Sequence, residues 1–492
     1  MSRTLTADQE QLVSVVRDPV RFARGILRHD LWSMQEEILR SVAENPRTAV
    51  KACHSSSKTF TAAEAVLWWI TRWPDGKVVT TAPTWTQVEK LLWGEIHRAA
   101  VRSRISYPPL YKTNLTIEEG ECYAMGLSTN EAERFQGFHG RVLIILDEAP
   151  GVRPVIWEAI EGIRAGGDVR VLALGNPTIA SGPFYDAFTK ERAGWKTFTI
   201  DAFDTPNLQG LTLEELLTLP EDELDIAPRP YLVTRRWVLE KYHDWGEGHP
   251  LWQARVRGQF PTQAEDALVS LAWLEAAKYA PIDAAPSQPV NAGLDVAGPG
   301  EDETVLAVRQ GRRLLSLQPW SQADPRGEVV AALEPHRDSL DKVNVDSVGI
   351  GYYMAQHLRD LDFPVRDVNV GQAAEDTEKY VNLKAEMYWG LRQRLQAGDL
   401  SGLDDEMAIG QLAGIRYKHN ARGQVVIESK EEARKRGVKS PDRAEAIMLA
   451  FAGSDEHESF EELQRLMQRV ERGQSITDLD AAEDELEEER TF

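Results

Sequence analysis

Cysteine and long apolar segments are scarce in this chain of 492 residues. Its only two cysteines, Cys53 and Cys122, cannot form a disulfide framework, which favours a reducing compartment. No apolar run approaches the roughly 20 residues of a membrane-spanning helix, and the first residues, MSRTLTADQE, lack the apolar centre of a signal peptide. We therefore expect a cytoplasmic protein without membrane contact.

Basic residues are outnumbered by acidic ones. There are 56 Lys and Arg against 78 Asp and Glu, a net charge of −22, whereas phosphate binding requires positive charge. The excess is uneven, because residues 454–492 carry 14 Asp and Glu against 4 Arg, a net −10 that leaves −12 for the first 453 residues. The composition therefore does not exclude a basic DNA-binding channel on an otherwise acidic protein. Residues 456–492 are predicted to be a flexible acidic tail.

The length of the chain predicts more than one domain, because single cores rarely grow beyond about 250–300 residues. The composition, 42% hydrophobic and 27% charged, is typical of globular domains. A Pro-rich stretch, PIDAAPSQP, suits an interdomain connection. We predict a first domain over 1–262, a linker over 263–290, and a second domain over 291–455.

One uninterrupted apolar run ends in two carboxylates. Residues 142–146, VLIIL, are followed by Asp147 and Glu148, which predicts a buried parallel strand whose carboxyl end presents both acids. In phosphate-loop ATPases the first such acid holds Mg²⁺, and a following Glu orients or deprotonates the attacking water. Two acids after a strand also occur by chance at turns, so this interpretation depends on a phosphate loop upstream.

A candidate phosphate loop lies at residues 48–60, TAVKACHSSSKTF. A short β-like run leads into His54, Ser55, Ser56 and Ser57, and a helix begins at Lys58 and Thr59. The usual pattern, G-x-x-x-x-G-K-[ST], has glycine where this chain has Ala52 and Ser57, and glycine permits a positive φ that costs serine some strain. Lys58 can still reach the β- and γ-phosphates of ATP, and Thr59 can ligate Mg²⁺.

A further strand is predicted at VRVLALGNPT, residues 169–178. Its end offers Asn176 and Thr178, whose polar side chains are able to sense the γ-phosphate.

Three acids in the second half of the chain fall on predicted core elements. Asp295 and Asp346 end strands, and Asp442 follows Ser440, a predicted helix N-cap, and Pro441. Clustered ionised acids are tolerated mainly when cations neutralise them. Each Asp alone is more often a turn former at a strand end, but the three together favour a metal site. Asp302, beside two Glu residues, is a fourth candidate or a solvated loop acid.

Basic side chains lie along a helix predicted over 376–400 and in the segments KHNARGQ and SKEEARKRGVKS. DNA phosphates are their natural target, although solvated helix faces have the same pattern. On the predicted helix these side chains are Lys379, Lys384, Arg392 and Arg394.

The order and spacing of the pieces in the first half resemble a known family. The pieces are Lys58-Thr59, LDEA at 146–149, GNPT at 175–178, DTPN at 204–207 and RGQFP at 257–261. They resemble the ATPase half of the terminase large subunits of tailed bacteriophages and prophages. The resemblance implies that Gln35 contacts adenine, that Glu148 is the catalytic base, and that Arg134 is an arginine finger for a neighbouring subunit. The chain departs from the family where His54 replaces a frequent arginine and Ser57 replaces glycine, which puts the ATPase rate in question.

The second half resembles the RNase H-like nuclease domain of the same family. The resemblance implies that Asp295, Asp346 and Asp442 are the catalytic acids and bind two Mg²⁺ or Mn²⁺ ions about 4 Å apart. The fold class expected is α/β: a phosphate-loop ATPase domain with a mostly parallel sheet flanked by helices, followed by an RNase H-like domain with a mixed sheet.

The function implied is ATP-driven translocation of double-stranded viral DNA into procapsids, with metal-dependent cutting of concatemeric DNA. The implied partners are double-stranded DNA, a portal protein, a small terminase subunit and further copies of the chain in a packaging ring. In solution the chain could instead be a monomer. The implied location is the bacterial cytoplasm and, transiently, the portal vertex. Two rivals remain open: another phosphate-loop translocase or helicase fused to an RNase H-like nuclease, and a degenerate nucleotide-binding structural module.

Overall fold

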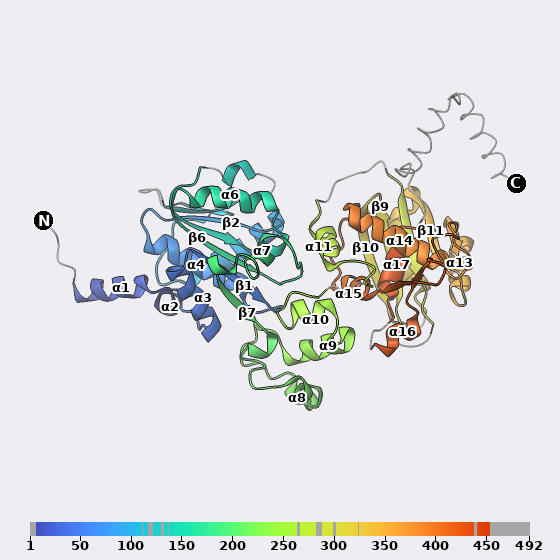
Figure 1. Ribbon diagram of the computed structural model, residues 1–492, viewed down its shortest axis with the longest axis horizontal. Coiled ribbons are helices and arrows are strands. Elements are labelled where there is room, and N and C mark those ends of the chain that lie inside the picture. Colours follow the sequence, from blue (N-terminus) through green and yellow to red (C-terminus); the bar gives the residue numbers. More distant parts are fainter. Residues whose placement is uncertain are drawn as a thin grey trace, which may run out of the picture.

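The computed structural model describes residues 6–110, 112–116, 122–128, 132–135, 137–262, 266–281, 288–298, 302–322, 324–436 and 440–452. The predicted acidic tail and part of the predicted linker lie outside these residues. The described chain forms two lobes, each built on its own sheet, with helices between them (Figure 1). Within this part of the chain, no helix has the length and apolar character that a membrane crossing requires.

The first lobe is built on a seven-stranded sheet in the order β3-β4-β2-β5-β6-β1-β7. All neighbouring strands are parallel except β3 and β4. The central strands are almost fully buried. Such burial on both faces favours continuous apolar runs, of which VLIIL in β5 is the clearest. The strands are β1 (Arg47–Ala52), β2 (Lys77–Thr81), β3 (Asn114–Thr116), β4 (Tyr123–Gly126), β5 (Gly140–Leu146), β6 (Gly167–Gly175) and β7 (Lys196–Ile200).

Helices cover both faces of this sheet, because successive residues of its strands point to opposite sides. Leu143 and Ile145 of β5 belong to the same hydrophobic cluster as the α4 side chains, whereas Ile144 belongs to the cluster that contains α6. The elements around the sheet are α1 (Ala7–Arg17), α2 (Pro19–Phe22), η1 (Ala23–Leu27), α3 (Ser33–Glu44), α4 (Lys58–Arg72), η2 (Gln87–Leu92), α5 (Trp93–Arg102), η3 (Ala132–Phe135), η4 (Ala149–Gly151) and α6 (Pro154–Arg164).

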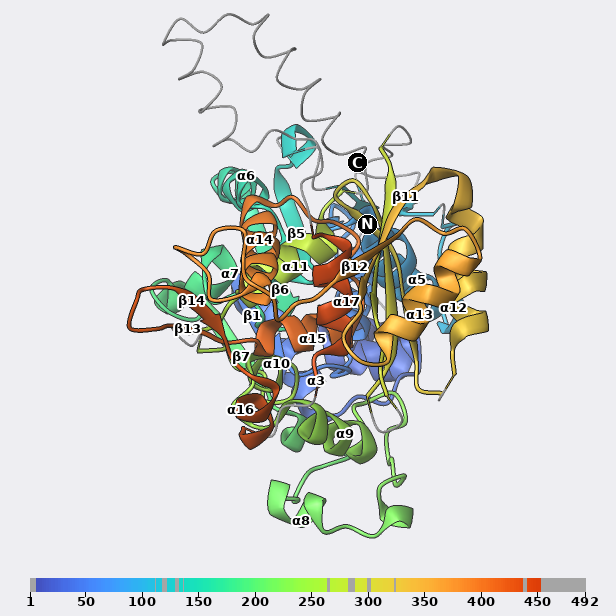
Figure 2. The same ribbon diagram turned by 90° about the vertical axis from the view of Figure 1, so that its right-hand side faces the viewer.

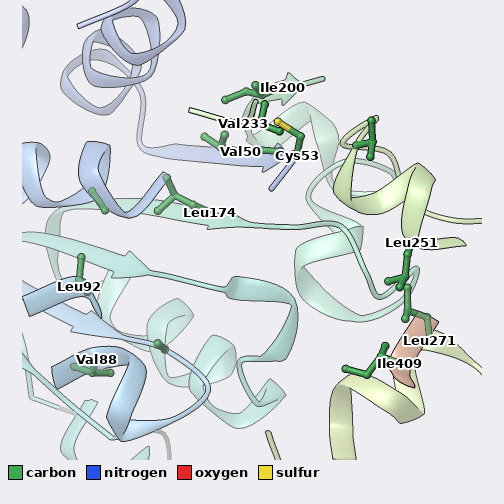
Figure 3. Close-up of a cluster of buried hydrophobic side chains, with 14 of the residues drawn as sticks. Val50, Cys53, Val88, Leu92, Leu174, Ile200, Val233, Leu251, Leu271 and Ile409 are labelled. Atoms are coloured by element: carbon green, nitrogen blue, oxygen red, sulfur yellow. The ribbon is translucent and has the colours of Figure 1, made fainter. Parts of the chain in front are cut away.

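In the described chain, two short helices lie between β6 and β7 of the first sheet, and six further helices lie between β7 and the second sheet. They are α7 (Gly182–Asp186), η5 (Arg192–Gly194), η6 (Ala202–Asp204), α8 (Leu213–Leu217), η7 (Glu221–Glu223), α9 (Arg235–Trp245), α10 (Pro250–Arg255) and α11 (Leu271–Tyr279). Leu251 of α10, Leu271 of α11 and Ile409 of the second lobe lie close together (Figure 3). They belong to one cluster that also includes Val50 and Leu174 of the first sheet. An apolar core therefore runs continuously from one lobe to the other.

The second lobe is built on a five-stranded sheet in the order β10-β9-β8-β11-β12. β9 is antiparallel to both β10 and β8, whereas β8, β11 and β12 are parallel to one another. This strand order and mixture of directions is that of an RNase H-like sheet, so the expected α/β fold class is confirmed for both lobes. The strands are β8 (Val290–Asp295), β9 (Thr304–Gln310), β10 (Arg313–Trp320), β11 (Leu340–Asp346) and β12 (Val365–Val368).

Helices lie on both sides of the second sheet, with α12 and α13 on one side and α14 and α17 on the other (Figure 2). Helix α17 crosses β8 closely, and a Cβ at Gly293 would lie 2.1 Å from the backbone nitrogen of Ala450. The remaining elements are α12 (Arg326–Leu333), η8 (Glu334–Ser339), α13 (Gly351–Asp360), α14 (Leu383–Ala397), α15 (Glu406–Gly414), β13 (Tyr417–His419), β14 (Val425–Ile427), α16 (Lys430–Lys435) and α17 (Asp442–Ala450).

Two local predictions in this lobe are wrong. The helix predicted over 376–400 begins only at Leu383, because the Asn382 side chain caps it by accepting from the backbone N–H of Ala385. Ser440 does not cap α17: Pro441 occupies the N-cap position, and the Ser440 hydroxyl donates to the Asp442 carboxylate instead.

Candidate nucleotide pocket and acidic cluster

The phosphate loop connects β1 to α4 and holds a strained backbone. Ser55 and Ser57 have φ values of +49° and +62°, in the left-handed region that favours glycine. Ser57 therefore adopts the conformation for which the usual motif has glycine. The Ser56 hydroxyl is buried without a hydrogen-bond partner in the part of the chain that the structure describes. A strained loop with an unsatisfied buried donor is typical of a site that a ligand completes.

The DTPN and RGQFP segments support this loop from behind. The Asn207 amide donates to three backbone carbonyls of the segment 229–233, and the N–H of Val233 donates to the Ser55 carbonyl at 3.0 Å. Gly258 has φ +60°, and a Cβ there would lie 2.4 Å from the Ile200 carbonyl oxygen. Cys53, Ile200 and Val233 lie together at the end of β1 (Figure 3). These two segments therefore shape the phosphate loop rather than line it.

The loop and the acid pair meet although they are 88 residues apart. β6 lies between β1, which leads into the loop, and β5, which leads into the acids. The Thr59 hydroxyl donates to Asp147 Oδ2 at 2.9 Å, and Lys58 Nζ donates to the Cys53 carbonyl at 3.3 Å. Burial, with the Glu148 charge beside it, raises the pKa of Asp147 to about 7. A bound cation would relieve that unfavourable burial of charge.

A cavity of about 550 Å³ opens in front of the loop. Seven of the nine residues that we predicted for nucleotide binding line it, together with the predicted catalytic base Glu148, whereas Gln35 and Asp147 do not. Its lining comprises His29, Asp30, His54, Ser55, Ser56, Ser57, Lys58, Thr59, Phe60, Glu95, Arg98, Ala99, Arg102, Glu148, Asn176, Arg229 and Tyr231.

His54 and Asn176 are each held in place by a contact with another part of the first lobe. The His54 ring stacks on Trp237 with centroids 5.5 Å apart, and burial, together with Lys58 and Arg255, lowers its pKa to about 4. His54 is therefore neutral at pH 7 and does not replace the charge of the arginine found in the family. The Asn176 amide donates to the Ala52 carbonyl at 2.7 Å, which ties the end of β6 to the start of the loop.

Gln35 and Arg134 lie outside the described lining of this cavity. Gln35 is 1% exposed, and its side-chain oxygen accepts from the backbone N–H of Trp32 at 3.2 Å, at the start of α3. Arg134 is an exposed residue of η3. Their roles in adenine contact and as a finger stay predictions.

The second-lobe acids gather at one edge of the mixed sheet. Leu294 of β8 is paired with Val345 of β11, so Asp295 and Asp346 end neighbouring parallel strands. Burial raises the pKa of Asp295 well above its ordinary value, and the charges of Glu445, Asp442 and Asp346 add to the effect. Burial also raises the pKa of Asp346 and of Asp442. The three acids therefore share one electrostatic environment.

Asp442 is held by the turn that carries the fourth candidate, Asp302. Its Oδ2 accepts from the backbone N–H of Glu303 at 2.9 Å. Asp302 itself is exposed, and its charge is among the causes that raise the pKa of Asp442. Asp302 therefore lies near the cluster but not in its buried part.

Glu445, Lys384 and Lys430 complete the cluster. The sequence analysis did not predict that they lie beside the three aspartates. Lys384 Nζ lies 2.6 Å from Glu445 Oε1, and Lys430 Nζ lies 3.1 Å from Glu445 Oε2. Burial alone would raise the pKa of Glu445, but the two ammonium groups outweigh it and lower that pKa. Glu445 follows Asp442 by three residues on α17, a spacing that places both on one helix face and could have identified it.

The cluster is not a preformed metal site. Among the described residues, no three His, Cys, Asp or Glu side chains converge as a group that could hold an ion. Lys384 and Lys430 supply positive charge to Glu445 from one side of the cluster. The donor set of carboxylate oxygens suits Mg²⁺ or Mn²⁺.

The basic side chains predicted to face DNA are largely engaged within the chain. Arg392 Nη1 donates to the Leu268 carbonyl, Arg394 pairs with Asp399 at 2.7 Å, and Lys379 pairs with Asp376 at 3.1 Å. Lys384 pairs with Glu445. These contacts give the positive charges structural roles, and the DNA-facing role of these residues stays a prediction.

The chain is similar to known proteins over most of its length, although no family model matches it. A protein described as a probable terminase, large subunit, from Enterobacteria phage P7 is 23% identical over 484 residues, which cover 92% of this chain and 94% of that protein. The large terminase of bacteriophage HK97 covers 89% of this chain and 99% of its own, at 12% identity and a TM-score of 0.37. The nuclease domain of the large terminase subunit of bacterial virus Sf6 covers 38% of this chain and 99% of its own, at 19% identity and a TM-score of 0.34.

The relative from phage P7 spans both lobes, and the motifs quoted above follow one another along the same stretch. The resemblance expected from those motifs is confirmed: the chain is similar to a probable terminase large subunit along nearly its whole length.

Proposed function

We propose that the chain is a DNA-packaging motor that hydrolyses ATP in its first lobe and cuts DNA in its second. The observation that carries the proposal is the contact between Thr59 and Asp147, which joins the phosphate loop and the acid pair at one cavity. The relative named as a terminase large subunit supports translocation of viral DNA as the work that ATP drives.

In the nucleotide cavity each residue is assigned a role. Lys58 and the loop N–H groups hold the β- and γ-phosphates, Thr59 and Asp147 hold Mg²⁺, and Glu148 orients the attacking water. When bound, the Mg²⁺ neutralises charge that develops on the phosphates. The unsatisfied Ser56 hydroxyl and the raised pKa of Asp147 both support a ligand and a cation at this place.

In the acidic cluster, Asp295, Asp346 and Asp442 are proposed as the carboxylates for Mg²⁺ or Mn²⁺, with Glu445 beside them. When bound, such ions supply an activated water and stabilise a leaving oxygen. Lys384 and Lys430 lower the pKa of Glu445 and so favour its ionised form. Nuclease domains of the large terminases of bacterial virus Sf6 and phage G20c have been solved with manganese, calcium, magnesium or cobalt.

We also propose the division of the chain at 263–290, a packaging ring of identical subunits, and partners in the form of duplex DNA, a portal protein and a small terminase subunit. The host cytoplasm and the portal vertex are the proposed locations. Among the described residues no second phosphate-loop sheet is present, since the second sheet has the RNase H-like strand order, which disfavours a helicase with two motor domains.

One pair of assays on the full chain tests the proposal. Phosphate release from ATP with Mg²⁺, and linearisation of a supercoiled plasmid with Mn²⁺, are measured on the same preparation. Turnover and cutting support the motor and the nuclease. Nucleotide binding without turnover would instead favour a nucleotide-binding structural module.

A further inference from the structure

An exposed apolar patch follows Asp346, one of the proposed nuclease carboxylates. Of the fifteen large apolar side chains that are exposed in the described chain, four fall within six residues just after this strand end. Single exposed apolar residues are common on soluble proteins, whereas a contiguous group indicates a surface that a partner covers. We call this group the 348–353 patch. Its members are Val348, Ile350, Tyr352 and Tyr353, which are 58%, 46%, 51% and 73% exposed.

The backbone turns sharply at the end of β11 and so holds the patch against the strand end. Gly349 has φ +69°, and the N–H of Val348 donates to Asp346 Oδ1 at 3.3 Å. Helix α13 then begins directly against the strand, because a Cβ at Gly351 would lie 1.8 Å from the Asp346 carbonyl oxygen. Only glycine permits so close an approach.

The patch also reaches the neighbouring strand end, which carries Asp295. A Cβ at Gly298, three residues after Asp295, would lie 3.1 Å from Cδ1 of Ile350. A Cβ at Gly351 would lie 3.9 Å from Cβ of Val296. The 348–353 patch therefore spans the segments that follow β8 and β11, directly beyond two of the proposed metal ligands.

The two tyrosines of the patch do not contribute to the core of the lobe. Helix α13 packs through Met354, Ala355 and Leu358, which are buried in the cluster on this side of the sheet. Tyr352 and Tyr353 lie on the outer side of its first turn, and their rings meet edge to face with centroids 5.7 Å apart. An exposed ring pair of this kind is suited to contact with further planar groups.

DNA is the partner that this position favours. A phosphate at Asp295 and Asp346 would lie beside the patch, and the groups next to a phosphate along DNA are deoxyribose and the base edges of a groove. Residues 347–353, SVGIGYY, include no acid that would repel the neighbouring phosphates. Aliphatic and aromatic side chains stack on bases or enter a base step from the minor groove.

The burial of the acids adds a requirement for distortion. Asp295 is 8% exposed and Asp442 is 5% exposed, whereas the patch beside them is open to solvent. A straight duplex resting on the patch would hold its phosphates away from these carboxylates. DNA that is bent at the patch can bring one phosphate to them, and bending is easiest where base stacking is weak.

We propose that the 348–353 patch enters the minor groove beside the phosphate to be cut and unstacks the base step there, which deepens the nuclease function proposed above and rests on it. Contacts between the patch and the opened step offset the free energy of unstacking. The chain should therefore prefer DNA that is easily unstacked at the cut.

The test compares two duplex oligonucleotides of equal length, one fully paired and one with a mismatched pair at its centre. Fluorescence anisotropy measures their binding to the full chain with Ca²⁺ as the metal, and gel electrophoresis afterwards verifies that both are intact. Wild type is expected to bind the mismatched duplex about tenfold more tightly, because the stacking at the mismatch is already weakened.

The double variant Tyr352→Ser/Tyr353→Ser should lose most of this preference and should cut supercoiled plasmid about tenfold more slowly with Mn²⁺. Tyr352→Phe/Tyr353→Phe retains the rings and should retain both properties. Leu361→Ser, an exposed position at the far end of α13, is the matched control.

Thermal melts and ATP turnover of every variant show whether it is folded. Ile350→Ser removes a single exposed side chain and should reduce the preference as well, which keeps the test valid should the double serine variant fold poorly.

Equal wild-type affinities for the two duplexes would overturn the proposal. A folded double serine variant that keeps the preference would overturn it too, because the patch then holds DNA without unstacking it or does not touch DNA. Loss of self-association in sedimentation velocity, with DNA binding unchanged, would instead make the patch an interface between copies of the chain. Wild-type protein that neither binds DNA nor cuts plasmid with Mn²⁺ would overturn the nuclease function itself.

Discussion

The Thr59 hydroxyl donates a 2.9 Å hydrogen bond to the Asp147 carboxylate, and this contact closes the phosphate loop onto the end of β5. Both groups are the proposed ligands of one Mg²⁺ ion. Their hydrogen bond keeps the buried Asp147 partly satisfied. The metal would therefore enter between two side chains that are already in contact.

Glu148→Gln should bind ATP yet hydrolyse it about 10² to 10⁴-fold more slowly, since the water-orienting carboxylate is lost while Thr59 and Asp147 remain. Lys58→Ala should weaken binding as well as turnover. Steady-state phosphate release and an equilibrium nucleotide titration distinguish the two variants. Turnover at the wild-type rate in Glu148→Gln would remove Glu148 from the mechanism.

Arg134 should act on the nucleotide of a neighbouring subunit, because it lies outside the described lining of its own cavity. Arg134→Ala and Glu148→Gln should each be inactive alone. Mixed rings of the two should regain part of the ATPase activity, because one interface then combines an intact Arg134 with an intact Glu148. Absence of recovery, with mixing verified by a labelled subunit, would contradict action between subunits.

Asp147 should make the metal-free protein less stable as pH rises. Its folded-state pKa is raised from 3.8 to about 7, so between these values the folded protein holds a proton that the unfolded chain has released. The free energy of unfolding therefore falls across this window and levels off above it. Asp147→Asn should reduce this loss of unfolding free energy between pH 5 and pH 8 by roughly 2–4 kcal/mol.

Denaturant titrations in EDTA at several pH values measure this difference. Asp222→Asn, at an exposed position in η7, is the control and should follow wild type. Parallel pH curves for Asp147→Asn and wild type would show that Asp147 is not the group responsible.

Asp295→Asn, Asp346→Asn and Asp442→Asn should each abolish most plasmid cutting, because each removes one proposed metal ligand. Relief of repulsion between acids should leave the melting temperature in EDTA unchanged or higher. ATPase activity of Asp346→Asn should stay close to wild type. Asp341→Asn, an exposed position at the start of the same strand β11, is the control.

A folded variant among these three that cuts plasmid normally would exclude its residue from the metal site. Asp302 and Glu445 would then be the next residues to replace.

Lys384→Met should lower the melting temperature in EDTA by the equivalent of about 2 kcal/mol, since Glu445 is then less well neutralised. Mn²⁺ should raise the melting temperature of this variant more than that of wild type, because the ion supplies the missing positive charge. Thermal melts with EDTA and with Mn²⁺ provide both values.

Lys418→Met is the control, because it breaks only an exposed pair with Glu432, which solvent screens strongly. A Lys384→Met variant with unchanged melts but weaker DNA binding would instead support the DNA-facing role predicted from the sequence.

The sequence by itself determined the kinds of elements and the residues at their ends. The apolar run at 142–146 predicts a buried strand, and it is the end of β5, with Asp147 and Glu148 following it. The strands that end in Asp295 and Asp346, and the α/β class of both lobes, were predictable for the same reason: the period and length of apolar runs are local properties.

Only the tertiary structure decided which of these residues meet. The contacts of Thr59 with Asp147, of His29 with Glu64, and of Lys384 with Glu445 span 88, 35 and 61 residues. No local pattern encodes such pairs, because they depend on strand order and on how helices pack across a sheet. Their physical cause is the burial of charge, which obliges each carboxylate to find a partner that the fold brings to it.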